Sequence, residues 1–153
     1  MLPTKQDQHD KPTTEVKGGF PVTFHYTAGI AMEKFYYGLK DQKLLANTCD
    51  HCDFTYLPPR FFCEDCFAEL GDENYQEVGP SGELLSFSEV FVDKRGDLLD
   101  SPYFVGLIKV EGTNTKFFHR LVNIDKPEIG MTVKAVWEDD RSGSYLDLKG
   151  FTS

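Results

Sequence analysis

The sequence predicts a mainly β protein with one short helix near its N-terminal end, and three observations support this fold class. Apolar residues recur at helical spacing over a single short segment, Ala31–Lys40. Five runs with strand-like patterns follow from residue 84 onwards, separated by turn residues. All four cysteines lie between the helix and these runs, in two closely spaced pairs. We therefore expect a helix, a cysteine-rich segment and a small β domain, in that order.

Composition narrows the classes of function. The chain has 153 residues, with 16 Lys+Arg against 25 Asp+Glu and a formal net charge of −9. This balance argues against nucleic-acid binding, because such binding depends on Lys and Arg side chains that neutralise phosphates. The first ten residues lack the apolar core of an export signal, and no stretch approaches the ~18 apolar residues of a membrane span. We expect a soluble, cytoplasmic protein without membrane contact.

The N-terminal part divides into two segments of different character. Residues 1–19 are polar and lack periodicity, so we expect a disordered tail. Residues 20–46 contain the predicted helix and are rich in aromatic side chains, which are enriched at protein interfaces. Packing against the chain's own core is the equally weighted alternative. The candidate docking residues are Phe20, Phe24, Tyr26, Phe35, Tyr36 and Tyr37.

A short strand at Lys43–Thr48 is expected to lead into the cysteines. Two C-x2-C pairs separated by ten residues can bring four thiolates to one tetrahedral centre, which suits Zn2+. In a reducing compartment such a pattern favours metal ligands over disulfides. We expect a rubredoxin-like zinc ribbon at residues 47–72, with iron in an electron carrier as the chemical alternative. The four metal ligands would be Cys49, Cys52, Cys63 and Cys66.

Catalytic patterns are missing from the sequence. Four protein ligands close the coordination sphere of a metal, so the site would be structural. The same four ligands use every cysteine of the chain, and the sequence contains no nucleophile elbow, phosphate loop or dinucleotide-binding glycine pattern. His119, next to Arg120 on a predicted strand, is expected at the barrel surface with its hydrogen bonds satisfied. We expect no enzymatic activity from this chain alone.

Residues 73–153 are expected to form a small OB-fold β-barrel, because closure of five short strands removes exposed edges. The predicted strands are Leu84–Val92, Tyr103–Val110, Lys116–Val122, Thr132–Trp137 and Tyr145–Lys149. Ribbons and OB folds also serve in nucleic-acid binding, which is therefore the alternative function. Its candidate base-stacking residues are Phe87, Phe91, Phe117 and Phe118.

Several segments resemble a known protein family. Phe35–Cys49 is similar to the approach to its ribbon, and Tyr56-Leu-Pro-Pro-Arg60 is similar to the link between its cysteine pairs. Similarity to its barrel strands is found in Gly79–Ser88, Ser101–Val110 and Ile129–Val133. This is the family of zinc-ribbon plus OB-fold proteins associated with acyl-CoA metabolism. The family usually carries Gly after the second cysteine of each pair, where this chain has Asp53 and Phe67, so we expect strain at both turns.

The resemblance implies a non-catalytic, zinc-binding accessory subunit of a thiolase-superfamily complex that acts on acyl-CoA thioesters. A thiolase-like subunit of the hetero-oligomer would bring the catalytic cysteine and histidine. The aromatic-rich N-terminus is similar to that of subunits serving thiolysis of an aromatic β-oxoacyl-CoA, such as benzoylsuccinyl-CoA. A free-standing acyl-CoA-binding protein is a further alternative. Candidate contacts to the phosphates of a shared CoA thioester are Arg60, Lys94, Arg95, Lys109 and Arg120.

Overall fold

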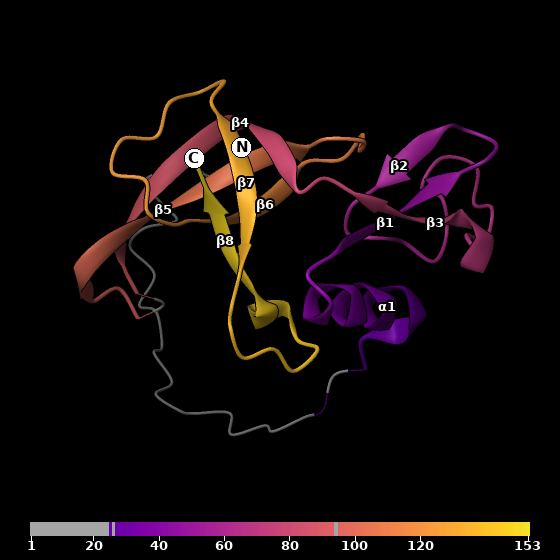
Figure 1. Cartoon of the computed structure of the whole chain (residues 1–153), viewed down its shortest axis with the longest axis horizontal. Helices are drawn as coiled ribbons and strands as arrows, with labels where there is room; N and C mark the ends of the chain where they lie inside the picture. Colours follow the sequence, from indigo (N-terminus) through magenta and orange to yellow (C-terminus); the bar gives the residue numbers. More distant parts are fainter. Residues whose placement is uncertain (1–24, 26, 94) are drawn as a thin grey trace, which may run out of the picture.

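A computed structural model describes residues 25, 27–93 and 95–153 (Figure 1). The described chain contains one α-helix, a three-stranded sheet and a closed five-stranded barrel, which confirms the predicted fold class. The expected tail at residues 1–19 lies outside the described residues. So do four candidate site residues, Phe20, Phe24, Tyr26 and Lys94. No helix in the described ranges has the length and apolar character needed to cross a membrane.

Helix α1 (Gly29–Lys40) begins two residues before the predicted start and ends where the sequence indicates. Gly38 allows the helix to approach the neighbouring sheet, because a Cβ atom there would lie 2.7 Å from Cγ of Leu45. At the C-terminal end of the helix, the carbonyl of Lys40 accepts a hydrogen bond from Nε of Arg141 at 2.8 Å. The helix is thereby fixed both to the sheet and to a loop of the barrel.

The three-stranded sheet has β1 (Leu44–Cys49) at its centre, one residue later than the predicted strand. Strands β2 (Phe54–Tyr56) and β3 (Tyr75–Val78) flank it, and both run antiparallel to it. A short 3-10 helix, η2 (Asp72–Asn74), precedes β3. Figure 1 shows this sheet and α1 together at one end of the molecule, beside the barrel. Strand β3 therefore belongs to the cysteine-bearing sheet by pairing and leads directly into the barrel.

The barrel closes in the strand order β4-β5-β6-β8-β7, as the OB-fold prediction requires. Its strands are β4 (Ser81–Val92), β5 (Leu98–Val110), β6 (Phe117–Leu121), β7 (Thr132–Trp137) and β8 (Leu148–Thr152). β7 matches its predicted bounds, and β6 is shorter by one residue at each end. β4 and β5 begin three and five residues earlier than predicted. These two strands pair over most of their length.

The prediction of the last strand at Tyr145–Lys149 is wrong. The first three of these residues form the 3-10 helix η3 (Tyr145–Asp147), and β8 starts only at Leu148. Ser144 and Asp147 form a capping box, in which each side chain accepts a hydrogen bond from the backbone of the other end of the turn. This local capping competes with strand formation, and periodicity alone does not reveal it.

Asp147 is a buried carboxylate that organises the preceding loop. It accepts hydrogen bonds from the backbone N–H groups of Ser142, Gly143 and Ser144 at 3.1, 2.7 and 3.2 Å. Burial by itself raises the pKa of Asp147, but these hydrogen bonds outweigh it and hold the pKa below its usual range. The ionised carboxylate is thus a structural element of this loop.

One apolar core joins the helix, the sheet and the barrel. Phe35 of α1 is completely buried in it and meets the ring of Phe117 edge to face, with centroids 6.2 Å apart. Members from each part include Phe35, Leu39, Leu44, Ala46, Val78, Ile108, Phe117, Val133 and Phe151. The helix therefore packs against the chain's own core, which was the alternative to docking. Phe35 is a core residue, and its prediction as a docking residue is wrong.

The turn between β5 and β6 attaches the barrel to the edge of β2. Asn114 exchanges two hydrogen bonds with the backbone of Thr55, at 2.8 Å through its Oδ1 and at 2.9 Å through its N–H. The hydroxyl of Thr115 accepts the N–H of Leu57 at 2.8 Å and donates to its carbonyl at 2.9 Å. These four bonds extend the cysteine-bearing sheet onto the barrel.

Candidate metal centre

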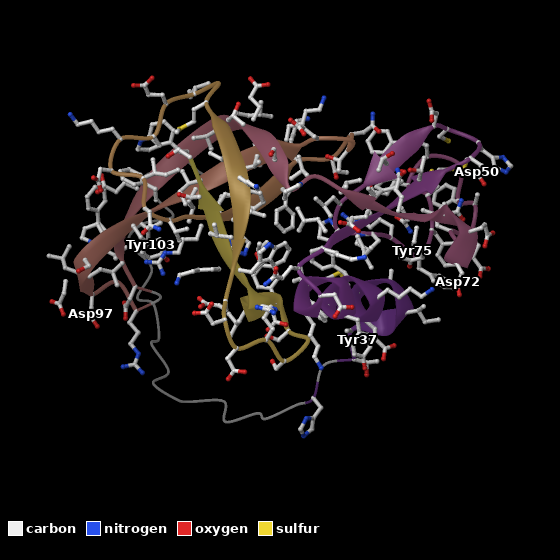
Figure 2. All side chains as sticks on the ribbon, viewed as in Figure 1. Tyr37, Asp50, Asp72, Tyr75, Asp97 and Tyr103 are labelled. Atoms are coloured by element: carbon white, nitrogen blue, oxygen red, sulfur yellow. The ribbon has the colours of Figure 1, made fainter. Side chains whose placement is uncertain are left out.

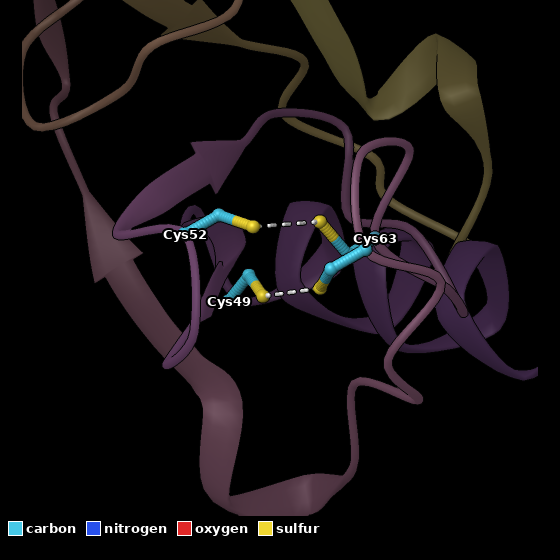
Figure 3. A group of neighbouring side chains, drawn as sticks. Cys49, Cys52 and Cys63 are labelled. Atoms are coloured by element: carbon cyan, nitrogen blue, oxygen red, sulfur yellow. Dashed lines mark hydrogen bonds between the residues drawn. The ribbon is translucent and has the colours of Figure 1, made fainter.

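The four cysteines converge at the end of the three-stranded sheet (Figure 3). All four Sγ atoms lie within 4.8 Å of one another. Cys49 and Cys66 are 3.6 Å apart at sulfur, and Cys52 and Cys63 are 3.8 Å apart. A tetrahedral Zn2+ with Zn–S bonds of about 2.3 Å requires sulfur atoms about 3.8 Å apart. The predicted ligand set therefore fits four-coordinate Zn2+, which these side chains would hold as a structural cross-link with no open coordination position.

The pKa values of the cysteine thiols also favour a cation at this site. Crowding raises the pKa of Cys52 to about 12, mainly through its hydrogen bond with Cys66 and then through burial. The backbone N–H of Cys66, and after it the hydroxyl of Tyr56, lower the pKa of Cys63 to about 6. Neighbouring thiolates repel one another, so four of them ionise together only around a positive ion.

Each cysteine pair lies on a tight turn whose last residue has a left-handed backbone conformation. The N–H of Asp53 donates to the carbonyl of Cys49 at 2.8 Å, and the N–H of Phe67 donates to that of Cys63 at 3.1 Å. The φ angles are +52° at Asp53 and +60° at Phe67. A residue with a side chain pays a free-energy cost in this conformation, which Gly adopts freely. Both turns thus adopt the left-handed conformation in which the expected strain would arise.

Tyr56 is a residue of this centre that spacing rules do not identify. Its side chain is 1% exposed, and its hydroxyl lies 3.3 Å from Sγ of Cys63. The same oxygen accepts the N–H of Glu64 at 3.1 Å. The hydrogen bond to Cys63, followed by burial, raises the pKa of Tyr56 to about 12. The neutral phenol thus donates to one metal ligand and orients it, as outer-shell groups do in zinc sites.

Asn47 holds the loop that separates the two cysteine pairs. It is completely buried on β1, and its amide makes two hydrogen bonds to the backbone of Arg60: Nδ2 to the carbonyl at 2.6 Å, and Oδ1 from the N–H at 3.1 Å. This contact fixes the Pro58-Pro59-Arg60 segment against the sheet. The Pro-Pro-Arg motif therefore has a structural role in the loop that joins the two cysteine pairs.

The aromatic docking candidates of the helix divide into three environments. Phe35 is in the core, Tyr36 is half-buried against it, and Tyr37 is 59% exposed. Only Tyr37 of these three presents most of its ring to solvent. Next to the helix, a pocket of about 570 Å3 is lined by apolar side chains and Arg60, including Ile30, Met32, Pro58, Pro59 and Phe61.

The structure does not bring the described CoA candidates together. Arg60 lines the pocket beside α1, and its guanidinium lies 3.5 Å from the carboxylate of Glu64. Lys109 lies on β5 in a groove with acidic neighbours, and Arg120 lies on β6 with its guanidinium 4.4 Å from the ring centroid of Tyr103. Arg95 is exposed in the turn after β4. These side chains occupy four separate places rather than one phosphate site.

The candidate base-stacking residues do not form one platform either. Phe117 is buried in the core, whereas its neighbour Phe118 points out of the barrel and is 60% exposed. Phe87 meets Phe104 of β5 edge to face, with ring centroids 6.0 Å apart. Phe118 pairs with Leu107, which lies on the opposite face of β5 from Phe104. Phe87 and Phe91 both lie on β4, whereas Phe117 and Phe118 lie on β6, so the four candidates do not form a single stacking platform.

His119 is buried and its ring nitrogens lack partners among the described residues, so its prediction as a satisfied surface residue is wrong. The residue is 7% exposed and lies 5.8 Å from the ring of Phe117 in a stacked arrangement. Burial lowers its pKa, so the ring is neutral and packs as an aromatic core residue.

A closed four-thiolate ribbon attached to a five-stranded OB barrel defines the class of two-domain zinc-ribbon and OB-fold proteins. Residues 38–71 match the model of the rubredoxin-like zinc ribbon domain of ChsH2, and residues 75–138 match the model of its C-terminal OB-fold domain. The chain belongs to the ChsH2-type family of zinc-ribbon and OB-fold proteins, which confirms the resemblance found in the sequence.

Two solved structures have similar folds. One is a DUF35-family protein of unknown function from Sulfolobus solfataricus, with 25% identity and a TM-score of 0.62 over 78% of this chain and 83% of that chain. The other is described as the Ltp2-ChsH2(DUF35) aldolase, with 23% identity and a TM-score of 0.58 over 78% of this chain and 91% of that chain. The latter likeness concerns the fold alone. No curated protein matches the chain.

Proposed function

We propose that this protein is a non-catalytic, zinc-binding accessory subunit of a thiolase-superfamily complex that acts on acyl-CoA thioesters. The observation that carries the proposal is the convergence of all four cysteines of the chain at one closed centre. A four-thiolate site has no open position for activating water, and it leaves no thiol for acyl transfer. The chemistry would therefore come from a partner that supplies a catalytic cysteine and histidine.

The comparisons support a role within an assembly. Both family models are named after ChsH2, and one structural neighbour is described as an aldolase of Ltp2 and ChsH2. The four-thiolate centre also favours a reducing compartment, and hence the cytoplasm, because thiols there remain unpaired and available to metal. The resemblance of the aromatic-rich N-terminal sequence to that of subunits serving thiolysis of benzoylsuccinyl-CoA supports an aromatic β-oxoacyl-CoA as the finer substrate class.

The pocket beside α1 supports a contact with the shared thioester. Its volume of about 570 Å3 lies within the range of small-molecule sites, and its lining combines apolar residues with Arg60. We assign Arg60 to a CoA phosphate and the exposed ring of Tyr37 to the partner. The pocket does not include three of the candidate cations, Arg95, Lys109 and Arg120. They would contact the same CoA molecule only if the partner held it along the barrel surface.

Co-expression with a thiolase-superfamily protein of the same genome tests the proposal. We expect the two chains to co-elute on a sizing column in a fixed ratio, with zinc equimolar to this subunit. The matched variant Cys66→Ser should bind no zinc and give less complex. Separate elution of the two wild-type chains, with thiolysis by the partner unchanged on mixing, would refute the accessory role.

A further inference from the structure

The outer parts of β4 and β5 form a two-stranded arm, which we define as residues 87–93 and 97–103. β7 pairs with β4 only at Ser81–Glu83, and β6 reaches along β5 only as far as Phe104. In the described part of the chain, the two strands of the arm therefore pair with each other alone. A hairpin of this kind has little stability by itself in water.

The arm exposes large apolar side chains at the end of the molecule. Phe87 is 38% exposed, Phe91 51%, Val92 45% and Leu98 81%. Isolated surface apolar residues are ordinary, but four exposed ones on a single, otherwise unsupported hairpin are typical of an interaction site. Figure 2 shows Asp97 and Tyr103 of this arm at the opposite end of the molecule from Asp50 of the ribbon. The arm is therefore a surface distinct from the metal centre.

The charged side chains of the arm are mostly acidic. Glu89, Asp97 and Asp100 are exposed, and the turn contributes Arg95 as a described cation. Asp93 has a local role, because its carboxylate accepts the N–H groups of Arg95 and Asp97 at 2.7 and 3.0 Å. The complementary surface is therefore apolar at its centre and carries Lys and Arg at its rim.

We propose that the arm docks on the thiolase-type partner, against the basic surface that surrounds its CoA entrance. An enzyme that takes up CoA must hold cations there for the phosphates, and such a surface attracts the carboxylates of the arm. A second copy of this chain is the less favourable occupant, because a two-fold contact between arms would place like charges together. This inference rests on the proposed function.

The test compares two full-length variants for binding to the purified thiolase-type subunit by calorimetry. Phe91→Ser combined with Leu98→Ser removes the exposed apolar side chains of the arm and should weaken binding about tenfold or more. Phe118→Ser is the matched control, because it removes an equally exposed ring from β6 outside the arm, and it should change affinity less than about twofold. Fluorescence of Trp137 in the barrel checks that both variants are folded.

A second variant tests the charge. Asp97→Asn with Asp100→Asn should weaken binding at low salt, and its affinity should depend less on salt concentration than that of the wild type. A wild-type complex that both arm variants retain at full affinity would overturn this inference and leave the proposed function standing. Absence of any wild-type complex would overturn both. A wild-type homodimer that the arm variants abolish would assign the arm to a second copy instead.

Discussion

The hydroxyl of Tyr56 lies 3.3 Å from Sγ of Cys63, and Tyr56 is the last residue of strand β2. The next residue, Leu57, exchanges two hydrogen bonds with the side chain of Thr115 in the turn between β5 and β6. A metal ligand and the barrel are thus linked through two consecutive residues. Loss of metal should therefore also destabilise the barrel.

Substitution of Tyr56 by Phe tests the support of the metal ligand. The variant keeps the ring and loses the donor to Cys63, so we expect about 1 kcal/mol less stability and zinc affinity lower by roughly 10- to 100-fold. Urea denaturation and competition with a chromophoric chelator measure the two effects. Tyr37→Phe, which changes an exposed phenol, is the control. Equal zinc affinity in Tyr56→Phe and the wild type would show that the phenol does not orient the ligand.

Removal of the metal should disorder the ribbon and loosen the barrel. Four thiolates around one ion convert binding energy into folding energy. We expect a strong chelator, or the substitution Cys49→Ser, to abolish zinc binding and lower the melting temperature reported by Trp137, the single tryptophan, which packs against the barrel core. A Trp137 transition unaffected by chelation would show that ribbon and barrel unfold independently.

Relief of backbone strain gives a stabilising substitution at Phe67. Its φ angle of +60° favours Gly, and its ring is 77% exposed, so little packing is lost. We expect Phe67→Gly to raise the free energy of unfolding of the zinc-bound protein by about 1 kcal/mol. Phe67→Ala removes the ring but keeps Cβ, and it should give no such gain. Equal stability of these two variants would argue against strain as the cause.

The hydrogen bonds of Thr115 provide a test of the attachment between ribbon and barrel. Thr115→Val is nearly isosteric and leaves the N–H and the carbonyl of Leu57 without this partner, so we expect a loss of about 1–3 kcal/mol in urea denaturation. Thr132→Val, at an exposed position of β7, should change stability by less than about 0.5 kcal/mol. A loss no larger than that of the control would place the attachment elsewhere.

The carboxylate of Asp147 gives a prediction for pH. Its pKa in the folded protein lies below the unfolded value of about 3.9, so its stabilisation is complete well above that pH and is lost as the pH falls through and below it. Asp147→Asn lacks this titration. We expect the stability difference between wild type and variant to be large at neutral pH and to shrink in acid. Urea midpoints across this range measure it, and a constant difference would contradict the assignment.

The four metal ligands were predictable from the sequence, whereas the residues that orient them and hold their loop were not. The two C-x2-C pairs carry their geometry locally, because each pair is one tight turn. The contributions of Tyr56 and Asn47 depend on which backbone and side-chain atoms the folded loop brings near them. No periodic pattern encodes such contacts.

The helix and the barrel show the same division between local pattern and tertiary context. Helical spacing placed Phe35 on one face correctly, but whether that face meets a partner or the core depends on the sheet beneath it. Alternation predicted a five-stranded barrel, yet the hydrogen bonds of Asp147 turned the expected start of β8 into a 3-10 helix. The sequence likewise did not indicate that β4 and β5 extend beyond the barrel as an arm, because strand length depends on neighbouring strands as well as on composition.

We propose that this chain does no chemistry itself and enables that of a thiolase-type partner. The most direct measurement is the steady-state rate of CoA-dependent cleavage of a β-oxoacyl-CoA by the partner, with and without the zinc-loaded chain. We predict no turnover by this chain alone, little by the partner alone, and a rate that rises with added chain and saturates at a fixed ratio. A partner rate that stays the same at every concentration of the chain would contradict the account.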